Sequence, residues 1–442
     1  MSATAPSESR AVEPPLDQVS GKSGRVAPWL RVAPAAFAVA WGGNHFTPML
    51  HLYEQLGHYS TTATNLLLGT YVFGLIPGLL LAAAFAARFG RRRVLIVGVG
   101  VSLLGSVVLA SCFPVFALLC LGRLLAGVGT GIGMTVGTSW IVALSRPPYD
   151  EHASTVAAPR RAALTLTLGF GLGAAVSGIL AQWGPSPTVL PYLVHIALTL
   201  AGLVLLLGAV EPPVHGRQRS WRSQLRIASV GDKRFRQLIL PVAPWVFTTA
   251  GVAYALLPEV IAPRLGSHVL IFATGICVVT LGAGALIQPH VHRLDRRTGG
   301  RALSAGLLTV TIGLALSALA CALISPAVAV LSAIVLGLGF GICVVAGLSE
   351  IQRFAPPGEV AGMTGLFYSL AYMGFLLPTG LAALSPLVSY PVLLSLVACA
   401  TALCLLRVLT AAASLAAEHT QLSAPSVRLE PTLRFRSRRG HS

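Results

Sequence analysis

Charged residues are scarce in this chain. Asp, Glu, Lys and Arg make up only 10% of its 442 residues, lysine occurs twice, and 55% of the residues are hydrophobic. Soluble domains carry about 25% charged residues, so the composition excludes an ordinary soluble protein. Apolar runs of about 20 residues recur from Trp29 to Leu409, which is the length that a helix needs to cross hydrocarbon. We therefore predict an all-α membrane protein with the lipid bilayer as its main solvent.

Signals of an enzyme, a metal site or a disulfide framework are also missing. The seven cysteines lie within or beside apolar runs, without a CxxC spacing or a His/Cys cluster, and this favours small buried hydrophobes. The chain contains no phosphate-binding glycine loop that ends in Gly-Lys-Ser/Thr. We expect no enzymatic activity, no cofactor and no metal.

Twelve apolar runs can be counted, and the charges between them alternate. Loops on one side of the predicted membrane carry nineteen Lys and Arg residues, whereas loops on the other side carry only Arg264. Basic residues beside spans mark the cytoplasmic side. Both termini are therefore expected in the cytoplasm, with the protein in the plasma membrane, and the net charge of +17 reflects topology rather than a nucleic-acid partner. The predicted runs are 29–53, 63–87, 94–112, 115–144, 162–184, 189–210, 238–262, 267–288, 302–323, 326–350, 361–386 and 388–410.

The longest internal loop divides the chain into two sets of six spans. Trp221, Leu225 and Ala228 share one side at helical spacing in this loop, which is typical either of a short helix on the membrane surface or of a plain basic linker. The predicted division is 1–28 (disordered cytoplasmic tail), 29–210 (N-terminal half), 211–237 (cytoplasmic linker), 238–412 (C-terminal half) and 413–442 (basic cytoplasmic tail).

The two halves repeat weakly. Gly127-Val-Gly-Thr-Gly131 in the fourth run matches Gly337-Leu-Gly-Phe-Gly341 in the tenth, and Arg88-Phe-Gly-Arg91 has a counterpart in Arg293-Leu-Asp-Arg296. Parallel repeats of this kind are found in transporters whose halves rock against each other.

Three segments resemble the major facilitator superfamily. The loop Ala83–Arg92 is similar to that family's Gly-x-x-x-Asp-Arg-x-Gly-Arg-Arg loop between helices 2 and 3, although Ala83 and Ala87 replace the Gly and the Asp. Arg123–Gly129 matches the Arg-x-x-x-Gly-x-Gly of helix 4 in the family's proton-driven drug and metabolite exporters. Gly169–Gly178 keeps the glycines of their antiporter motif but lacks its Gly-Pro pair.

This resemblance implies a major facilitator fold of twelve transmembrane helices in two six-helix halves. It also implies a monomeric secondary active transporter that works by alternating access. We expect proton-coupled efflux of a small amphipathic or apolar compound. Two alternatives stay open: an uptake carrier for a polar nutrient, suggested by the missing Gly-Pro pair, and a transport-inactive sensor or scaffold, suggested by the missing Asp at position 87.

Polar groups inside predicted spans are the candidate site residues. Arg123 lies about nine residues inside the fourth run and either couples protons to conformational change through a carboxylate or forms a structural pair. Asn44 and His45 lie near the middle of the first helix, and His45 is a candidate proton carrier or a histidine bonded to a neighbouring helix. Glu259 is a candidate for proton or substrate coupling near the outer end of helix 7.

Other residues are expected to shape the pathway. Tyr368 and Tyr372 share a helix face and either line an amphipathic pocket or pack against neighbours. The latch between the halves is expected in the loops that hold Arg88, Gly90, Arg91, Arg92, Arg293, Asp295 and Arg296. Close helix packing is expected at Gly127, Gly129, Gly131, Gly169, Gly171 and Gly173.

Overall fold

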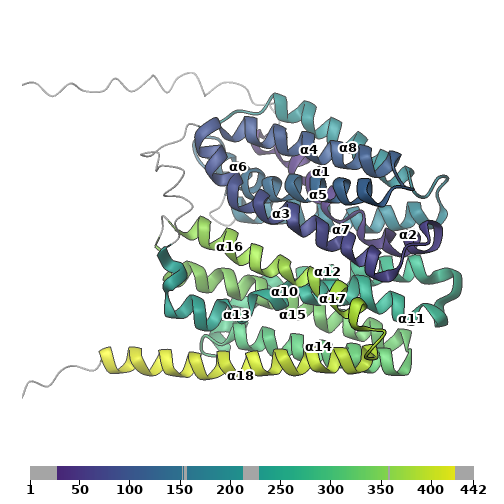
Figure 1. The fold of residues 1–442 in the computed structure, drawn as a ribbon. Coiled ribbons are helices and arrows are strands. Elements are labelled where there is room, and N and C mark those ends of the chain that lie inside the picture. The colour runs from purple at the N-terminus through teal and green to yellow at the C-terminus, as the bar shows by residue number, and fades with distance from the viewer. Residues whose placement is uncertain (1–26, 152, 154–156, 213–227, 357–358, 424–442) are drawn as a thin grey trace, which may run out of the picture.

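A computed structural model of the chain describes residues 27–151, 153, 157–212, 228–356 and 359–423. All regular structure in these ranges is helical (Figure 1). The predicted tails before residue 27 and after residue 423, and the linker segment around Trp221 and Leu225, lie outside the described residues. The α-helices are α1 (Ala33–Asn44), α2 (Leu50–Gly57), α3 (Thr61–Phe89), α4 (Arg91–Ser111), α5 (Phe116–Ile132), α6 (Thr138–Leu144), α7 (Ala157–Trp183), α8 (Leu190–Leu207), α10 (Ala243–Gly251), α11 (Leu257–Leu265), α12 (Val269–Ile287), α13 (Val291–Arg297), α14 (Ala302–Leu323), α15 (Pro326–Phe354), α16 (Val360–Tyr372), α17 (Leu377–Leu384) and α18 (Tyr390–Ser423).

These helices make twelve membrane crossings. Ten segments of the described chain are long and apolar enough to span a bilayer. One of them, Phe235–Arg297, has 63 residues, about three times the roughly 20 that one crossing needs, and it turns back at Gly266–His268. A further crossing comes from α1 and α2, which the 3₁₀ turn Thr47–Met49 joins. The predicted all-α membrane fold with twelve spans is confirmed.

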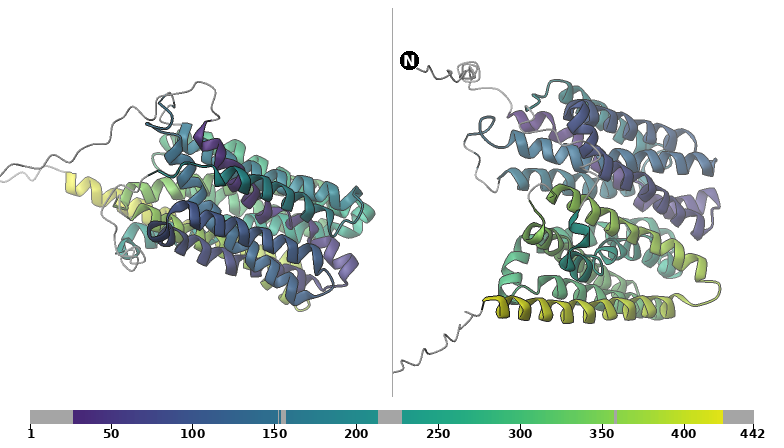
Figure 2. Two further views of the ribbon diagram at one scale, coloured as in Figure 1. Left: turned by 90° about the horizontal axis from the view of Figure 1, so that it is seen from above. Right: turned by 60° about the vertical axis from the view of Figure 1, so that its left-hand side comes forward.

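The crossings form two halves that lie side by side (Figures 1 and 2). Helices α1 to α8 build the N-terminal half and α10 to α18 the C-terminal half. Each half begins its first crossing with the same Ala-Pro-x-x-Phe pattern, Ala33–Phe37 and Ala243–Phe247, and this offset of 210 positions also relates Gly127 to Gly337. The internal repeat seen in the glycines therefore extends to the helices that meet at the interface.

The outward faces of the bundle are apolar. Helices α4, α8, α14 and α18 carry exposed side chains such as Val97, Val204, Ile312 and Leu403. In water such a belt would be unfavourable, but lipid tails solvate it at no cost.

Four crossings are interrupted midway. The first contains the 3₁₀ turn Thr47–Met49, the fourth and seventh contain the π-helical segments Gly133–Gly137 and Val252–Leu256, and the eleventh contains the 3₁₀ turn Met373–Leu376. Such breaks in the hydrogen-bond ladder are frequent at functional sites and hinges.

Five of the six predicted packing glycines lie at close helix contacts. A Cβ added at Gly127 would overlap the backbone carbonyl oxygen of Tyr71 on α3, and Gly131 and Gly129 meet α3 and α4 in the same way. On α7, Gly169 and Gly173 are one turn apart and approach the α1 backbone, with Cβ distances of 2.6 and 2.7 Å to carbonyl oxygens. The expectation for Gly171 was wrong, because this residue lies between them on the opposite side of α7 and a Cβ there meets nothing within 4 Å.

This contrast gives a matched pair of variants. Gly127→Ala should destabilise the protein by about 1–3 kcal/mol, because the methyl group forces α3 and α5 apart. Gly171→Ala should leave stability unchanged or raise it slightly, because alanine favours the helix and meets no neighbour. Unfolding of the purified proteins in detergent measures both. Equal stability of the two variants would show that close α3–α5 contact does not hold this half together.

Candidate functional site

The two halves enclose a cavity of about 310 Å³. The same four crossings of each half form its wall: the first, second, fourth and fifth of the N-terminal half and their repeats in the C-terminal half. The wall is mostly apolar. Its residues are Gly43, Asn44, Thr47, Leu68, Tyr71, Arg123, Met134, Ala163, Leu166, Thr167, Phe170, Phe247, Tyr254, Leu281, Ala285, Gln288, Phe340, Val344, Val345, Leu348, Tyr368, Tyr372 and Phe375.

The cavity extends toward one end of the bundle. We call this the arginine-rich end, because the loop with Arg88–Arg93 lies there together with α13. Ala163 and Leu348 in the wall are six residues from the ends of their helices at this side, which corresponds to about 9 Å along the axis. At the opposite end, where α2 and α11 lie (Figure 1), the wall stops about ten residues short of the ends of the first and seventh crossings.

Contacts between the halves close the opposite end. Asn44 Nδ2 on α1 lies 3.7 Å from Cys277 Sγ on α12. Gly178 on α7 packs so tightly on Thr274 of α12 that a Cβ would overlap Thr274 Oγ1, and a Cβ at Gly69 would lie 2.9 Å from Leu376. Because Gly178 and Gly69 have no Cβ, the two halves can come into contact here.

Arg123 lies in the wall at the closed end of the cavity. It is fully buried; Nε donates to the backbone carbonyl of Leu67 at 3.3 Å. The guanidinium carbon is 4.4 Å from the ring centre of Phe46 and 4.5 Å from that of Tyr71, so two aromatic faces cover it. Within the described residues Arg123 forms no ion pair, and Nη1 has no hydrogen-bond partner. The sequence therefore located this residue, but the expected carboxylate partner is absent from the part of the chain described.

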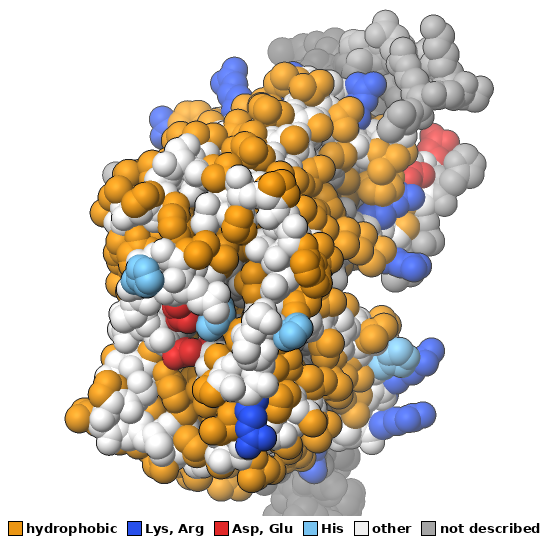
Figure 3. Space-filling view, turned by 90° about the vertical axis from the view of Figure 1, so that its right-hand side faces the viewer, with side chains coloured by type: hydrophobic (Ala, Val, Ile, Leu, Met, Phe, Trp, Pro, Cys, Tyr) orange, Lys and Arg blue, Asp and Glu red, His pale blue; other side chains and the backbone are white. Residues whose placement is uncertain are grey.

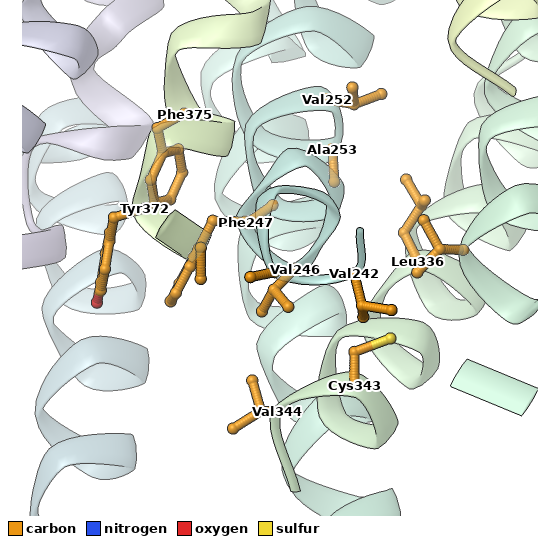
Figure 4. Close-up of a cluster of buried hydrophobic side chains, with 14 of the residues drawn as sticks. Val242, Val246, Phe247, Val252, Ala253, Leu336, Cys343, Val344, Tyr372 and Phe375 are labelled. Carbon is orange, nitrogen blue, oxygen red and sulfur yellow. The ribbon is translucent and has the colours of Figure 1, made fainter. Parts of the chain in front are cut away.

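The C-terminal wall is an aromatic cluster, as Figure 4 shows for part of it. Phe247 and Tyr372 stack with ring centres 3.9 Å apart. The ring centre of Phe247 also lies 5.3 Å from that of Phe340, in an edge-on arrangement, and 5.2 Å from that of the tilted Phe375 ring. We call these four residues the aromatic cluster. Tyr368 also lines the cavity, so the pocket-lining alternative for Tyr368 and Tyr372 agrees with their positions.

Each helix interruption supplies a wall residue. Thr47, Met134, Tyr254 and Phe375 come from the four broken segments. Asn44 precedes the first break; its Nδ2 donates to the Phe170 carbonyl at 3.0 Å and its Oδ1 accepts from Thr47 Oγ1 at 2.7 Å.

His45 does not face the cavity. It is fully buried inside the N-terminal half, with its ring 4.9 Å from that of His195 and 5.0 Å from that of Tyr192. Successive side chains of a helix point in directions about 100° apart. Because Asn44 lies in the cavity wall, the side chain of His45 points into the core of the half. Both ring nitrogens of His195 have other hydrogen-bond partners. Nδ1 lies 2.7 Å from Ser106 Oγ, and Nε2 lies 2.9 Å from the Ala38 carbonyl oxygen. His45 is thus not in a substrate pathway in this conformation.

Glu259 lies outside the main cavity, in a small hollow at the opposite end. Glu54 of the N-terminal half lies there too, accepting from Thr64 Oγ1 at 2.6 Å and contacting His51 Nδ1 at 3.2 Å. Figure 3 views this end and shows acidic side chains flanked by histidine between the halves. The hollow holds about 10 Å³, roughly one water. Thr47 and Tyr254 line both the hollow and the main cavity, so they separate them.

The loop Arg88–Arg92 contacts its own half rather than the other one. The Arg92 guanidinium donates to the Leu207 carbonyl at the end of α8, and the Arg92 backbone N–H donates to Glu211 Oε1 at 3.2 Å. Glu211, at the start of the linker, also lies against Gly90, which has φ +90°. A carboxylate from the linker thus caps the positive end of α4, close in sequence to Ala87.

The equivalent loop of the C-terminal half carries a charge network. Asp295 pairs with Arg353, which lies 3.2 Å from Glu350, and Glu350 is 3.0 Å from Arg234. Arg293 and Arg296 are exposed. Both loops therefore bind elements of their own halves, in keeping with a cavity that extends toward this end, and the expected latch between the halves is not formed in this conformation.

Most of the cavity wall cannot be identified from the sequence. Tyr71, Phe170, Phe247 and Phe340 sit in apolar runs where any aromatic residue is compatible with lipid contact or core packing. The repeat of Ala-Pro-x-x-Phe could have singled out Phe247, because it aligns the first crossings of the two halves.

Comparisons with known proteins agree with this architecture. The family model described as the Major Facilitator Superfamily matches residues 32–379. None of the curated proteins compared with the chain matches it.

Solved structures show the same fold. A point mutant of the nucleoside transporter NupG is 13% identical at a TM-score of 0.70, over 87% of this chain and 99% of that chain. NupG itself is 12% identical at 0.68, with the same coverage. A POT family transporter in complex with a thioalcohol-conjugated peptide is 12% identical at 0.68, over 87% of this chain and 96% of that chain.

The opening of the cavity can be tested by thiol labelling in a variant without native cysteines. Ala285→Cys lies in the wall, and Leu56→Cys replaces a half-exposed residue at the opposite end. A membrane-impermeant maleimide should modify Ala285→Cys in inside-out vesicles only and Leu56→Cys in intact cells only. The reverse pattern would show that the arginine-rich end faces outward. Labelling of Ala285→Cys from both sides would contradict a cavity closed at one end.

Proposed function

The chain belongs to the major facilitator superfamily and is a membrane transporter, and on that premise we propose that it exports a small amphipathic compound in exchange for protons. The observation that carries this proposal is the central cavity, shared between the halves, apolar over most of its wall and closed at one end. The arginine-rich end would face the cytoplasm, as the distribution of basic loops predicts.

The cavity suits a compact molecule with an apolar body. Its volume of about 310 Å³ is at the lower end of small-molecule sites, which span about 300–1,000 Å³. The aromatic cluster offers stacked and edge-on rings, which contribute favourable contacts beyond burial of their area. A polar nutrient would find few hydrogen-bonding groups there, and this favours export of an amphipathic compound over the alternative of polar-nutrient uptake.

The closed end suggests how access alternates. Contacts at Gly178–Thr274 and Asn44–Cys277 join crossings one and five to crossing eight. For the substrate to leave at the opposite end these contacts must separate while the arginine-rich ends approach. The four helix interruptions lie beside the cavity, where a change in local backbone hydrogen bonding allows halves of a helix to tilt.

The hollow with Glu54 and Glu259 is the proposed proton site. One carboxylate comes from each half, and both line the same hollow. Two ionised carboxylates repel each other across a closed interface. Protons that bind from the outside would therefore stabilise closure of this end, and the loss of those protons would favour opening. Thr47 and Tyr254 lie between this site and the substrate cavity and line both.

Export and coupling can be measured in energised inside-out vesicles. A panel of 2-naphthoate, 2-naphthamide and 2-naphthylmethylammonium covers anionic, neutral and cationic forms of one apolar body. At least one should accumulate in the vesicles, dissipate the pH gradient reported by a quenched acridine dye, and stop accumulating with a protonophore. Accumulation that ignores the gradient, or none for all three compounds, would contradict the proposal.

Glu259→Gln separates coupling from binding. Removal of the titratable group should abolish gradient-driven accumulation while substrate counterflow, which needs no net proton movement, is retained within about twofold. Glu151→Gln, an exposed residue at the arginine-rich end, is the matched control and should behave as wild type. Full gradient-driven transport by Glu259→Gln would remove this residue from the proton path.

A further inference from the structure

The cavity wall carries one formal charge. Among its described residues, Arg123 is cationic, and the wall includes neither Asp nor Glu. Most other wall residues are apolar or aromatic, with Asn44, Thr47, Thr167 and Gln288 as neutral polar groups. The cavity as a whole is therefore electrostatically positive.

The protein does not neutralise this charge within the part described. Arg123 forms no ion pair there, and its Nη1 atom is buried without a hydrogen-bond partner. Aromatic faces of Phe46 and Tyr71 compensate part of the lost hydration through cation–π attraction. A buried charge nevertheless remains unfavourable unless an opposite charge or further hydrogen bonds accompany it, and Arg cannot shed its proton to escape this.

Comparison of equivalent positions in the internal repeat shows that the two halves contribute different groups to the wall. With the offset of 210 positions, Ala333 of α15 is the repeat equivalent of Arg123 of α5. The C-terminal half therefore has no charge at the equivalent position. It supplies the aromatic cluster instead. Tyr71 links the two sides, since one of its faces carries the guanidinium and its ring centre lies 6.5 Å from that of Tyr372.

We propose that the cavity binds amphipathic monoanions: molecules with one carboxylate and an aromatic or similarly flat apolar body. The carboxylate lies at the Arg123 side of the wall and forms an ion pair with the guanidinium, while the apolar body packs on the aromatic cluster. This assignment rests on the proposed function, because it names the substrate class of the same cavity. Cations are disfavoured by the like charge, and dianions by the presence of one basic group.

Binding to the purified protein in detergent tests the assignment without requiring transport. Isothermal titration at pH 7 compares 2-naphthoate with its near-isostere 2-naphthamide and with 2-naphthylmethylammonium. We expect the carboxylate to bind at least about tenfold more tightly than the amide, as a charge-assisted hydrogen bond to a buried guanidinium allows, and the ammonium to bind more weakly still. Equal or tighter binding of the amide or the ammonium would overturn the proposal.

Variants assign the preference to Arg123. Arg123→Gln should reduce the carboxylate-to-amide affinity ratio to about one with little change for the amide, and Arg123→Lys should retain most of the ratio. A ratio unchanged in Arg123→Gln would overturn the assignment. A purely structural role predicts equal loss for both ligands, which would also overturn it.

Gln288 provides charge variants that do not disturb the buried arginine. It lies in the wall and is partly exposed, so Gln288→Glu and Gln288→Lys should fold even if Arg123→Gln does not. The carboxylate-to-amide affinity ratio should fall about threefold in the first variant and rise about threefold in the second, because a Coulomb interaction acts on the charged ligand alone. Shifts of the opposite sign, or none, would overturn the proposal.

Failure of the export proposal and failure of the anion assignment give different results. If vesicles accumulate the amide or ammonium and the acid does not bind, the transporter assignment stands and the anion assignment falls. If the acid binds selectively but nothing crosses the membrane, export is wrong while the anion site remains.

Discussion

A guanidinium buried between aromatic rings, without a carboxylate partner in the described chain, is the interaction on which the site depends. Hydrocarbon excludes uncompensated charge, so most of the described basic residues lie at helix ends or between helices. Arg123 lies inside the bundle, where Phe46, Tyr71 and the Leu67 carbonyl surround it. The same contacts hold α5 against α3 and against Phe46, which follows α1 in the first crossing, at the closed end of the cavity. In the proposed site, packing and substrate recognition therefore share one residue.

The twofold repeat explains the form of the cavity. Differences between the two halves explain the chemical character of its wall. Equivalent crossings from each half build the wall, and breaks in four of them place Thr47, Met134, Tyr254 and Phe375 there. The halves then differ in what they contribute: the N-terminal half provides the charge and the C-terminal half the aromatic cluster. The arginine-rich end shows the same asymmetry, because Glu211 from the linker caps α4 in one half, whereas Asp295, Arg353, Glu350 and Arg234 form a network in the other.

The fold could be predicted from sequence because lipid imposes a simple rule, in which long apolar runs span and arginines stay outside. Part of the cavity wall could be predicted as well. Arg123, Asn44, Tyr368 and Tyr372 were found as polar groups in apolar runs, and all line the cavity. His45 was misplaced because the orientation of a helix about its axis decides between cavity and core, and membrane helices with apolar residues all round give little sign of it. Phe247 and Phe340 were missed for the same reason.

The most direct measurement is the orientation of a bound amphipathic anion. A crystal of the protein with 6-bromo-2-naphthoate allows the bromine to be located by its anomalous scattering, independently of the ring density. We expect bromine at the aromatic cluster of Phe247, Phe340, Tyr372 and Phe375, with the carboxylate at Arg123. Bromine beside Arg123, with the carboxylate directed toward the arginine-rich end, would contradict it.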